Sequence, residues 1–265
     1  MHINTKMDMT PAELRQSCRT GLFTGTTSGK ALGFVQANLM ILKEELADDF
    51  RLFCMENPKP LPILEISNIG CPVPLSSAPS ADLRTDLPKY NIFKYGELVE
   101  EPVEIGHLWQ DGLVCFLIGC SFTFERAMLI ENIPVRHIEE NKNISMYRTN
   151  IECIPSGSFS GPLVVTMRPI PADLVEKAER LSDKYPGAHG SPIHKGDPYF
   201  LGIEDLDKSD YGDSVSIYDD EIPVFWACGV TLLEAIKRSK PDFAITHAPG
   251  HMFVTDLEDN MLFSE

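Results

Sequence analysis

The alternation of apolar and polar positions predicts strands and helices that follow one another along the chain. Residues 114–119, 163–168 and 224–229 are almost entirely apolar, which is typical of buried strands. Residues 35–42 form a further buried segment that carries two side-chain amides. Apolar residues at helical spacing predict a helix over 43–54. These segments are long enough to form the core of a globular protein.

Local signals place the remaining elements. Thr10 and Glu13 form a capping box that begins a helix ending near Gly21, and a helix is predicted over 171–184. Shorter strands are expected at 63–67 and 135–138, with a hairpin around Gly96.

Two strand–turn–helix units stand out. The strand at 114–119 leads into a helix at 121–130, and the strand at 224–229 leads into a helix at 231–239 and the closing strands at 243–256. This order predicts an α/β core with parallel strands.

Pro-, Ser- and Gly-rich stretches indicate where the chain divides. The loops at 21–33 and 70–88 are irregular, and long loops of this kind tend to be functional. Candidate boundaries lie near 155–158 and 219–221. We expect a discontinuous main α/β domain, residues 1–155 plus 222–265, and a smaller α+β subdomain over 156–221.

Charge and cysteine content narrow the classes of function. Of 265 residues, 39 are acidic and 23 basic, for a net charge of −16, which disfavours nucleic acid and anionic membranes as partners. Seven cysteines without a CxxC motif indicate free thiols in a reducing, cytoplasmic environment. The first eight residues lack the layout of a signal peptide.

The segment 243–256 places polar groups in an apolar stretch. His247 and His251 are four residues apart, but Pro249 and Gly250 between them break a helix, so the helical zinc arrangement HExxH is excluded. The pattern predicts a strand, a tight turn and a strand, with both imidazoles available to one pocket. They are candidates for catalytic acid and base.

Two cysteines lie where a strand passes into a helix. Cys120 and Cys228 each precede a predicted helix N-terminus, which lowers the pKa of a thiol and offers free amides to an anion. Either residue is a candidate nucleophile or acid–base group, and the amides are a candidate oxyanion site. The alternative is that both simply fill a tight turn.

Several arginines have few charges near them in sequence. Arg84, Arg148 and Arg168 are candidates for binding a substrate carboxylate. The alternative is a structural ion pair with Asp82, Asp86, Glu125 or Glu139.

The other histidines carry weaker signals. His189, His194 and Asp197 could join His247 and His251 in a metal site, but hydrogen-bonded loop histidines are the simpler interpretation. His137 near two glutamates suits either a proton shuttle or a surface turn.

The chain resembles the bacterial hydro-lyase family that is also grouped as the D-glutamate cyclase family. The resemblance rests on segments that follow one another along nearly the whole chain: 33–38, 82–88, 119–125, 134–140, 146–150, 167–171, 225–231 and 246–256. In the segment 24–29, TGTTSG stands where a run like TGPTAG is expected, so the glycines are kept.

The resemblance implies a larger three-layer α/β domain with a mixed sheet, a smaller α+β subdomain, and a lyase that removes water. We expect a carbon–oxygen lyase on a small carboxylate or amino-acid substrate, such as D-glutamate closing to 5-oxo-D-proline. The matching segments and the chemistry above supply the candidate residues: His247, His251, Cys228, Cys120 and Glu125 as catalytic, and Arg84, Arg148, Asn150, Arg168 and Thr231 as substrate-binding.

No metal ion or other cofactor is expected, and the expected partner is the small carboxylate itself, with assembly into a homo-oligomer left open. The rival hypothesis is a non-enzymatic protein that binds an amino-acid derivative, for which the same arginines would serve binding alone. A metal-dependent hydrolase is a third, weaker option.

Overall fold

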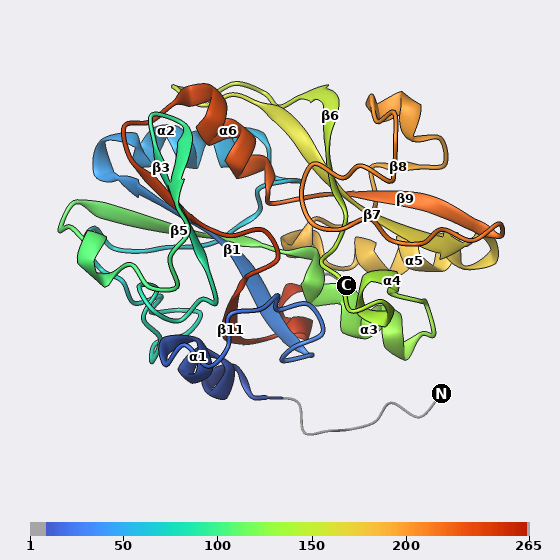
Figure 1. Cartoon of the computed structure of the whole chain (residues 1–265), viewed down its shortest axis with the longest axis horizontal. Helices are drawn as coiled ribbons and strands as arrows, with labels where there is room; N and C mark the ends of the chain where they lie inside the picture. The colour runs from blue at the N-terminus through green and yellow to red at the C-terminus, as the bar shows by residue number, and fades with distance from the viewer. Residues whose placement is uncertain (1–8, 264–265) are drawn as a thin grey trace.

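The computed structural model describes residues 9–263, which form two β-sheets lying side by side (Figure 1). The larger sheet has the strand order β2 (Ile63–Ile66), β5 (Leu113–Gly119), β1 (Phe34–Lys43), β10 (Ala244–His247), β3 (Tyr90–Lys94), β4 (Glu97–Glu100), with β11 (Phe253–Glu258) also paired to β1. The smaller sheet has the order β6 (Met146–Glu152), β7 (Pro162–Pro171), β9 (Glu221–Ala227), β8 (His194–Lys195).

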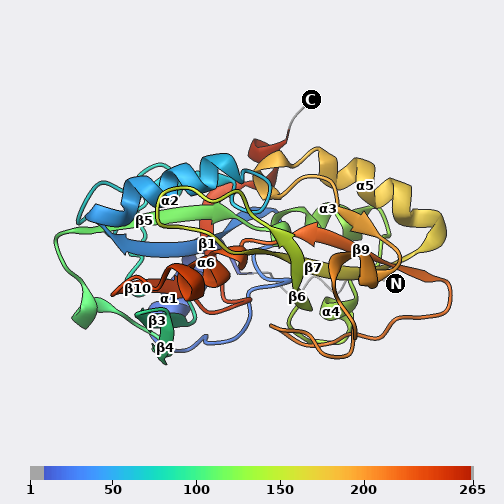
Figure 2. The same ribbon diagram turned by 90° about the horizontal axis from the view of Figure 1, so that it is seen from above.

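Six α-helices surround the two sheets within the described residues. They are α1 (Pro11–Arg19), α2 (Glu44–Glu56), α3 (Glu125–Ile130), α4 (Arg136–Glu139), α5 (Val175–Asp183) and α6 (Thr231–Ser239). The predicted capping box of α1 is confirmed, because Thr10 and Glu13 bond reciprocally. Helices α2 and α5 lie on the same side of the molecule, one beside each sheet (Figure 2).

The long strand β1 organises the larger sheet. One edge pairs with β5 over its length from Ala37 to Lys43, and the other edge is divided between β10 and β11. Both β10 and β11 are antiparallel to β1, so they run in the same direction and do not form a hairpin. The turn at Pro249 and Gly250 therefore interrupts an edge rather than reversing the chain.

Alternation along the strands creates separate cores on the two faces of each sheet. Met40 and Leu42 of β1 contribute to a core that also takes side chains from α2, α6 and the smaller sheet. Leu39 and Ile41 belong to the core on the opposite face. In the smaller sheet Trp226 packs toward α3 and α5. The core of Met40 and Leu42 thus joins the two sheets, which places their junction in a dry interior.

The α/β class predicted from sequence is confirmed, but the expected parallel strands are wrong. All pairings between named strands of the described chain are antiparallel. The strand–helix–strand order misled because its two strands join different sheets: β9 lies in the smaller sheet, while β10, which follows α6, lies in the larger. The strand expected at 135–138 is also wrong, since this segment forms α4.

The domain division stays a prediction. The strands of the smaller sheet run from Met146 to Ala227, beyond the predicted range 156–221 at both ends. The N-terminal residues judged unlike a signal peptide, 1–8, lie outside the described residues. Within 9–263, none of the helices has the length and apolar character needed to span a bilayer.

Gly119, the last residue of β5, provides a test of the contact between the sheet and the loop at Gly187. A Cβ atom at Gly119 would lie 1.7 Å from the carbonyl oxygen of Gly187, whereas one at Gly112 would meet nothing within 4 Å. Gly119→Ala should lower the free energy of unfolding by about 1–3 kcal/mol or more through forced backbone movement. Gly112→Ala should change it by no more than about 0.5 kcal/mol. Urea unfolding of both variants measures the difference, and equal effects would contradict the contact.

Candidate active site

A buried ion pair joins the two sheets. Glu125 is the first residue of α3 and Arg168 lies on β7, and both side chains are 0% exposed. Arg168 Nη2 donates to Glu125 Oε1 at 2.6 Å and to Ser121 Oγ at 3.1 Å, while Nη1 donates to Thr166 Oγ1 at 3.3 Å. A charge buried without such partners would be strongly destabilising, so the pair is structurally required as built.

Aromatic rings surround the same guanidinium. Arg168 Cζ lies 5.3 Å from the ring centroid of Phe124 and 5.4 Å from that of Trp226. Cation–π attraction of this kind gains strength away from water. The rings therefore help to hold a cation in the interior.

His137 completes the cluster. Its Nε2 lies 3.0 Å from Glu125 Oε1 and 3.0 Å from Ser28 Oγ, and Ser28 Oγ lies 3.1 Å from Glu125 Oε2. The imidazole stacks on Phe122 with ring centroids 6.0 Å apart. A carboxylate, an imidazole and a hydroxyl thus meet within hydrogen-bond distance, which is the geometry required for proton transfer.

The charges of the cluster determine which groups are ionised. Burial by itself would raise the pKa of Glu125, but the charges of His137 and Arg168 and their hydrogen bonds outweigh it and lower that pKa to about 2. Glu125 is therefore a carboxylate at neutral pH. Its negative charge lies in contact with His137 Nε2, at 3.0 Å.

The two cysteines lie near this cluster but carry no activated thiol. Burial raises the pKa of Cys228 to about 12 and that of Cys120 still higher, although the charge of Arg168 acts in the opposite direction on both. The expected lowering by a helix N-terminus is wrong, because burial dominates. The roles proposed for both residues in catalysis stay predictions, and these thiols are protonated at neutral pH.

The turn amides at Cys228 are used within the turn. The amide of Val230 donates to Cys228 Sγ at 3.4 Å, and that of Thr231 donates to Cys228 O at 3.1 Å. Thr231 Oγ1 in turn accepts from the amide of Val164 at 3.0 Å. Thr231 therefore fastens α6 to β7, and its role in substrate binding stays a prediction.

His247 projects to the face of the larger sheet opposite the Cys228 turn. Its Nδ1 lies 3.1 Å from the amide nitrogen and 3.3 Å from the carbonyl oxygen of Leu39, and it pairs with Tyr90, so it lies in the core of Leu39 and Tyr90. Asn38, the next position along β1, projects to the other face, where a Cβ at Gly229 would lie 2.1 Å from its Nδ2. The β10–β11 segment and the Cys228 turn therefore do not present these groups to one cleft.

Burial sets the protonation of both histidines in this segment. Burial lowers the pKa of His247 to about 4, opposed by its hydrogen bond with the Leu39 backbone and assisted by the charge of His251. The pKa of His251 is also lowered, again mainly by burial, and its Nδ1 lies 3.0 Å from Pro249 O. His247 Nε2 has no partner among residues 9–263. Both catalytic roles stay predictions.

Three of the residues predicted to bind substrate contact residues outside the Glu125 cluster. Arg84 pairs with Asp82 at 2.7 Å, and Arg148 pairs with Asp210 at 2.7 Å. Asn150 is exposed on β6 and packs against Gly202. The structural alternative for Arg84 and Arg168, pairing with Asp82 and Glu125, is confirmed.

The remaining histidines bond locally. His189 Nδ1 lies 2.9 Å from Lys59 O, and His194 Nε2 lies 2.8 Å from Asp197 O, which confirms the loop-histidine interpretation. Within 9–263, no three His, Cys, Asp or Glu side chains are grouped so as to hold a metal ion.

Sequence reasoning missed part of the cluster. The pattern at 135–138 predicts a strand, which leaves His137 beside its sequence neighbours Glu139 and Glu140. The helix α4 turns it toward Glu125 instead. Ser28 and Ser121 carried no signal beyond lying in small-residue turns of the segments 21–33 and 119–125.

Acid should destabilise the protein in two separate pH windows. His189 and His247 have folded pKa values of about 4 against 6.5 for the free side chain, so the unfolded state binds more protons below 6.5. The stability due to their neutral forms is complete above about pH 6.5 and is lost as the pH falls toward 4. Glu125, with a folded pKa of about 2 against 4.5, adds stability that is complete above 4.5 and lost as the pH falls toward 2. Urea unfolding between pH 7.5 and 2 measures both windows. His247→Gln should reduce the dependence of the free energy of unfolding on pH in the upper window only. An unchanged dependence there would contradict a neutral, buried imidazole at His247.

Removing the carboxylate should unbalance Arg168. Glu125→Gln should lower the free energy of unfolding by about 3–5 kcal/mol, since it leaves a buried guanidinium without its counter-charge. Glu131→Gln removes the same charge from a half-exposed pair with Lys177 and should cost no more than about 1 kcal/mol. Urea unfolding at pH 7 compares the two variants. Equal losses of free energy of unfolding would contradict the requirement of Arg168 for the counter-charge of Glu125.

Curated proteins with similar sequences indicate the family of this chain. The chain is 55% identical over 255 residues to "Putative hydro-lyase Teth514_1597" of Thermoanaerobacter sp. (strain X514), with 96% of each chain covered. It is 52% identical over 259 residues to "Putative hydro-lyase BLi00500/BL02808" of Bacillus licheniformis, with 98% of each covered. It is 51% identical over 254 residues to "Putative hydro-lyase YcsI" of Bacillus subtilis (strain 168), with 96% of this chain and 99% of that protein covered.

The chain of a nitrogen repressor-like protein, MJ0159 from Methanococcus jannaschii, aligns with 92% of this chain and 98% of its own length, but at a TM-score of 0.38 and 10% identity. The family evidence comes from sequence: the profile described as D-glutamate cyclase matches residues 114–256, which include Glu125, His137 and Arg168. Together with the relatives above, this match shows that the chain belongs to the D-glutamate cyclase family.

Proposed function

We propose that this protein is a lyase that removes water from a small carboxylate-bearing substrate, with His137 as the group that transfers the proton. One observation carries the proposal: His137 Nε2 lies 3.0 Å from both Glu125 Oε1 and Ser28 Oγ. The names of the relatives support lyase chemistry. The closure of D-glutamate to 5-oxo-D-proline is the first reaction to test.

Each residue of the cluster has a distinct task in this proposal. The carboxylate of Glu125 stabilises an imidazolium, so His137 can take a proton and return it to the departing oxygen. Arg168 is a positioning residue, because it holds Glu125 Oε1 at 2.6 Å. Ser28 Oγ provides a short path for a proton between His137 and a substrate at the loop.

The reaction balances without a further reactant. The nitrogen of D-glutamate forms a bond to the carbon of its side-chain carboxylate, and one carbon–oxygen bond of that carboxylate breaks. The ammonium group gives up two protons, which end on the departing oxygen, so it leaves as water. A base and an acid are needed in turn, and one imidazole can serve as both.

Substrate has to enter beside Ser28. His137 is 1% exposed, whereas Ser28 is partly exposed and belongs to the loop at 24–29. The loop is anchored at Thr27, whose amide donates to Gly250 O at 2.9 Å and whose Oγ1 accepts from the amide of Met252 at 3.0 Å. We infer that Ser28 meets the entering substrate at the surface, while Thr27 holds the loop in place.

Substitution of His137 tests the proposal. His137→Gln should reduce the turnover of D-glutamate about 100-fold or more, since general acid–base catalysis typically contributes that much. Turnover is followed by mass spectrometry as loss of water, with formation of 5-oxo-D-proline identified on a chiral column. His194→Gln, which alters a loop histidine bonded to Asp197 O, serves as the matched control and should leave turnover unchanged.

The same assay separates the rival sites and functions. His251→Ala should retain activity if the Glu125 cluster is catalytic, and a loss confined to this variant would favour the β10–β11 segment instead. A panel of other small carboxylates, screened by thermal shift, identifies alternative substrates. Stabilisation by a carboxylate without loss of water from any of them would contradict lyase activity and favour the binding-protein hypothesis.

A further inference from the structure

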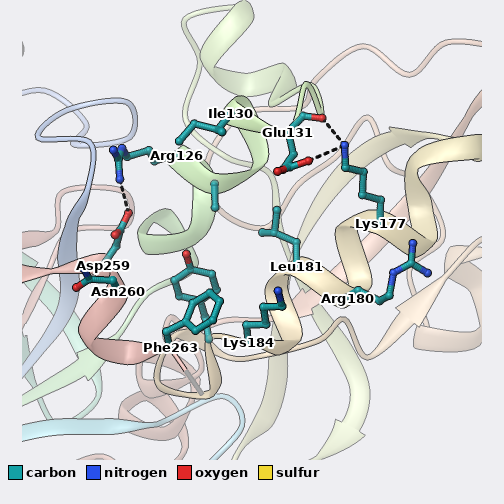
Figure 3. Close-up of a pocket in the computed structure, with 12 residues that line it drawn as sticks. Arg126, Ile130, Glu131, Lys177, Arg180, Leu181, Lys184, Asp259, Asn260 and Phe263 are labelled. Atoms are coloured by element: carbon teal, nitrogen blue, oxygen red, sulfur yellow. Dashed lines mark hydrogen bonds and ion pairs between the residues drawn. The ribbon is translucent and has the colours of Figure 1, made fainter. Parts of the chain in front are cut away.

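A second candidate site lies at the surface between α3, α5 and the last described residues. An open pocket of about 610 Å³ is formed there, within the size range of small-molecule sites (Figure 3). Its charged lining residues are Arg126, Lys177, Arg180, Lys184, Glu131 and Asp259. Four basic groups against two acidic ones leave an excess of positive charge, on a chain whose net charge is −16. This local reversal indicates an anionic ligand.

Two of the four cations are neutralised inside the pocket. Lys177 pairs with Glu131 at 2.8 Å, and Arg126 lies 3.5 Å from Asp259, as the dashed lines in Figure 3 show. These pairs form opposite walls of the pocket and leave little attraction for a ligand.

Of the other two cations, Lys184 is available to a ligand. Lys184 has no carboxylate within 4 Å among residues 9–263, and Arg180 reaches only Glu176, at 3.4 Å, in a pair exposed to solvent on its own helix. Glu176 does not line the pocket. Figure 3 shows the guanidinium of Arg180 extending away from Lys184, on the outer side of α5, so Lys184 is the cation that an anionic group in the pocket can meet.

The pocket also exposes apolar surface beside these cations. Phe263 is 47% exposed and Ile130 is 58% exposed. The ring of Phe263 packs edge-on against Tyr185 with centroids 5.5 Å apart, and Lys184 Nζ lies 5.2 Å from the Phe263 centroid. A flat ring can therefore lie against Phe263 and Ile130 while its charged group meets Lys184.

We propose that this pocket binds a small aromatic anion, with its carboxylate at Lys184 and its ring against Phe263 and Ile130. The site is separate from the Glu125 cluster. Glu125 precedes Arg126 in α3, but its side chain is fully buried and directed to Arg168.

Binding of 2-naphthoate to the full chain tests this inference. The dissociation constant, measured by isothermal titration calorimetry at low salt, should rise about fivefold in Lys184→Gln, as expected for one exposed ion pair. Phe263→Ala should weaken binding by a similar factor through loss of ring contact. Lys208→Gln removes the same charge from an exposed residue outside the pocket and should change affinity less than twofold.

Two competitors complete the test. The neutral analogue 2-naphthalenemethanol should bind about fivefold more weakly, because it lacks the anionic group that pairs with Lys184. D-glutamate should not displace 2-naphthoate, because it lacks the ring. The inference is overturned if the wild-type protein does not bind 2-naphthoate at millimolar concentration, or if Lys208→Gln weakens binding as much as Lys184→Gln. Displacement by D-glutamate would also overturn it, since the pocket would then be the substrate site rather than a separate one. None of these outcomes depends on whether His137 is catalytic.

Discussion

The ion pair between Arg168 and Glu125 is the constraint on which the junction of the two sheets depends. Arg168 belongs to β7 of the smaller sheet, while Glu125 follows directly from β5 of the larger sheet through the turn Ser121–Phe124. A buried pair adds little net stability relative to apolar packing, but neither partner can be lost alone without leaving a charge in the interior. The pair therefore determines how the two sheets are arranged more than it contributes to the free energy of unfolding.

The same pair sets the chemistry around it. Arg168 and His137 keep Glu125 ionised, while burial keeps the neighbouring thiols of Cys120 and Cys228 protonated. A carboxylate held by a fixed guanidinium is a stable counter-charge for an imidazole. His137 is the acid–base side chain in hydrogen-bond contact with this carboxylate, so the proposal assigns proton transfer to it rather than to a cysteine.

Local sequence signals predicted most helices and strands. They did not predict which strands pair with one another, because the paired strands lie far apart in the chain. The capping box at Thr10 and the apolar strand β5 depend on neighbouring residues and were found. The parallel arrangement was wrong because β9 and β10 join different sheets, and no signal in α6 reports which sheet the next strand will enter. Likewise, α4 is only four residues long, and its apolar positions fit a strand equally well.

The polar residues of the segment 243–256 show why a dense local motif can mislead about a site. Thr246 Oγ1 donates to His247 O at 2.8 Å, and Thr255 Oγ1 donates to Val35 O at 2.9 Å. Asp256 accepts from Arg15 of α1 at 2.7 Å. The hydroxyl of Thr255 therefore bonds to the backbone of β1, Asp256 holds the N-terminal helix, and Thr246 bonds within β10. Glu125, His137 and Arg168 are instead dispersed over more than forty residues, so that only the tertiary fold brings their side chains together. Because a sequence displays clustering along the chain and not in space, the weaker local signal of His137 belonged to the better candidate site.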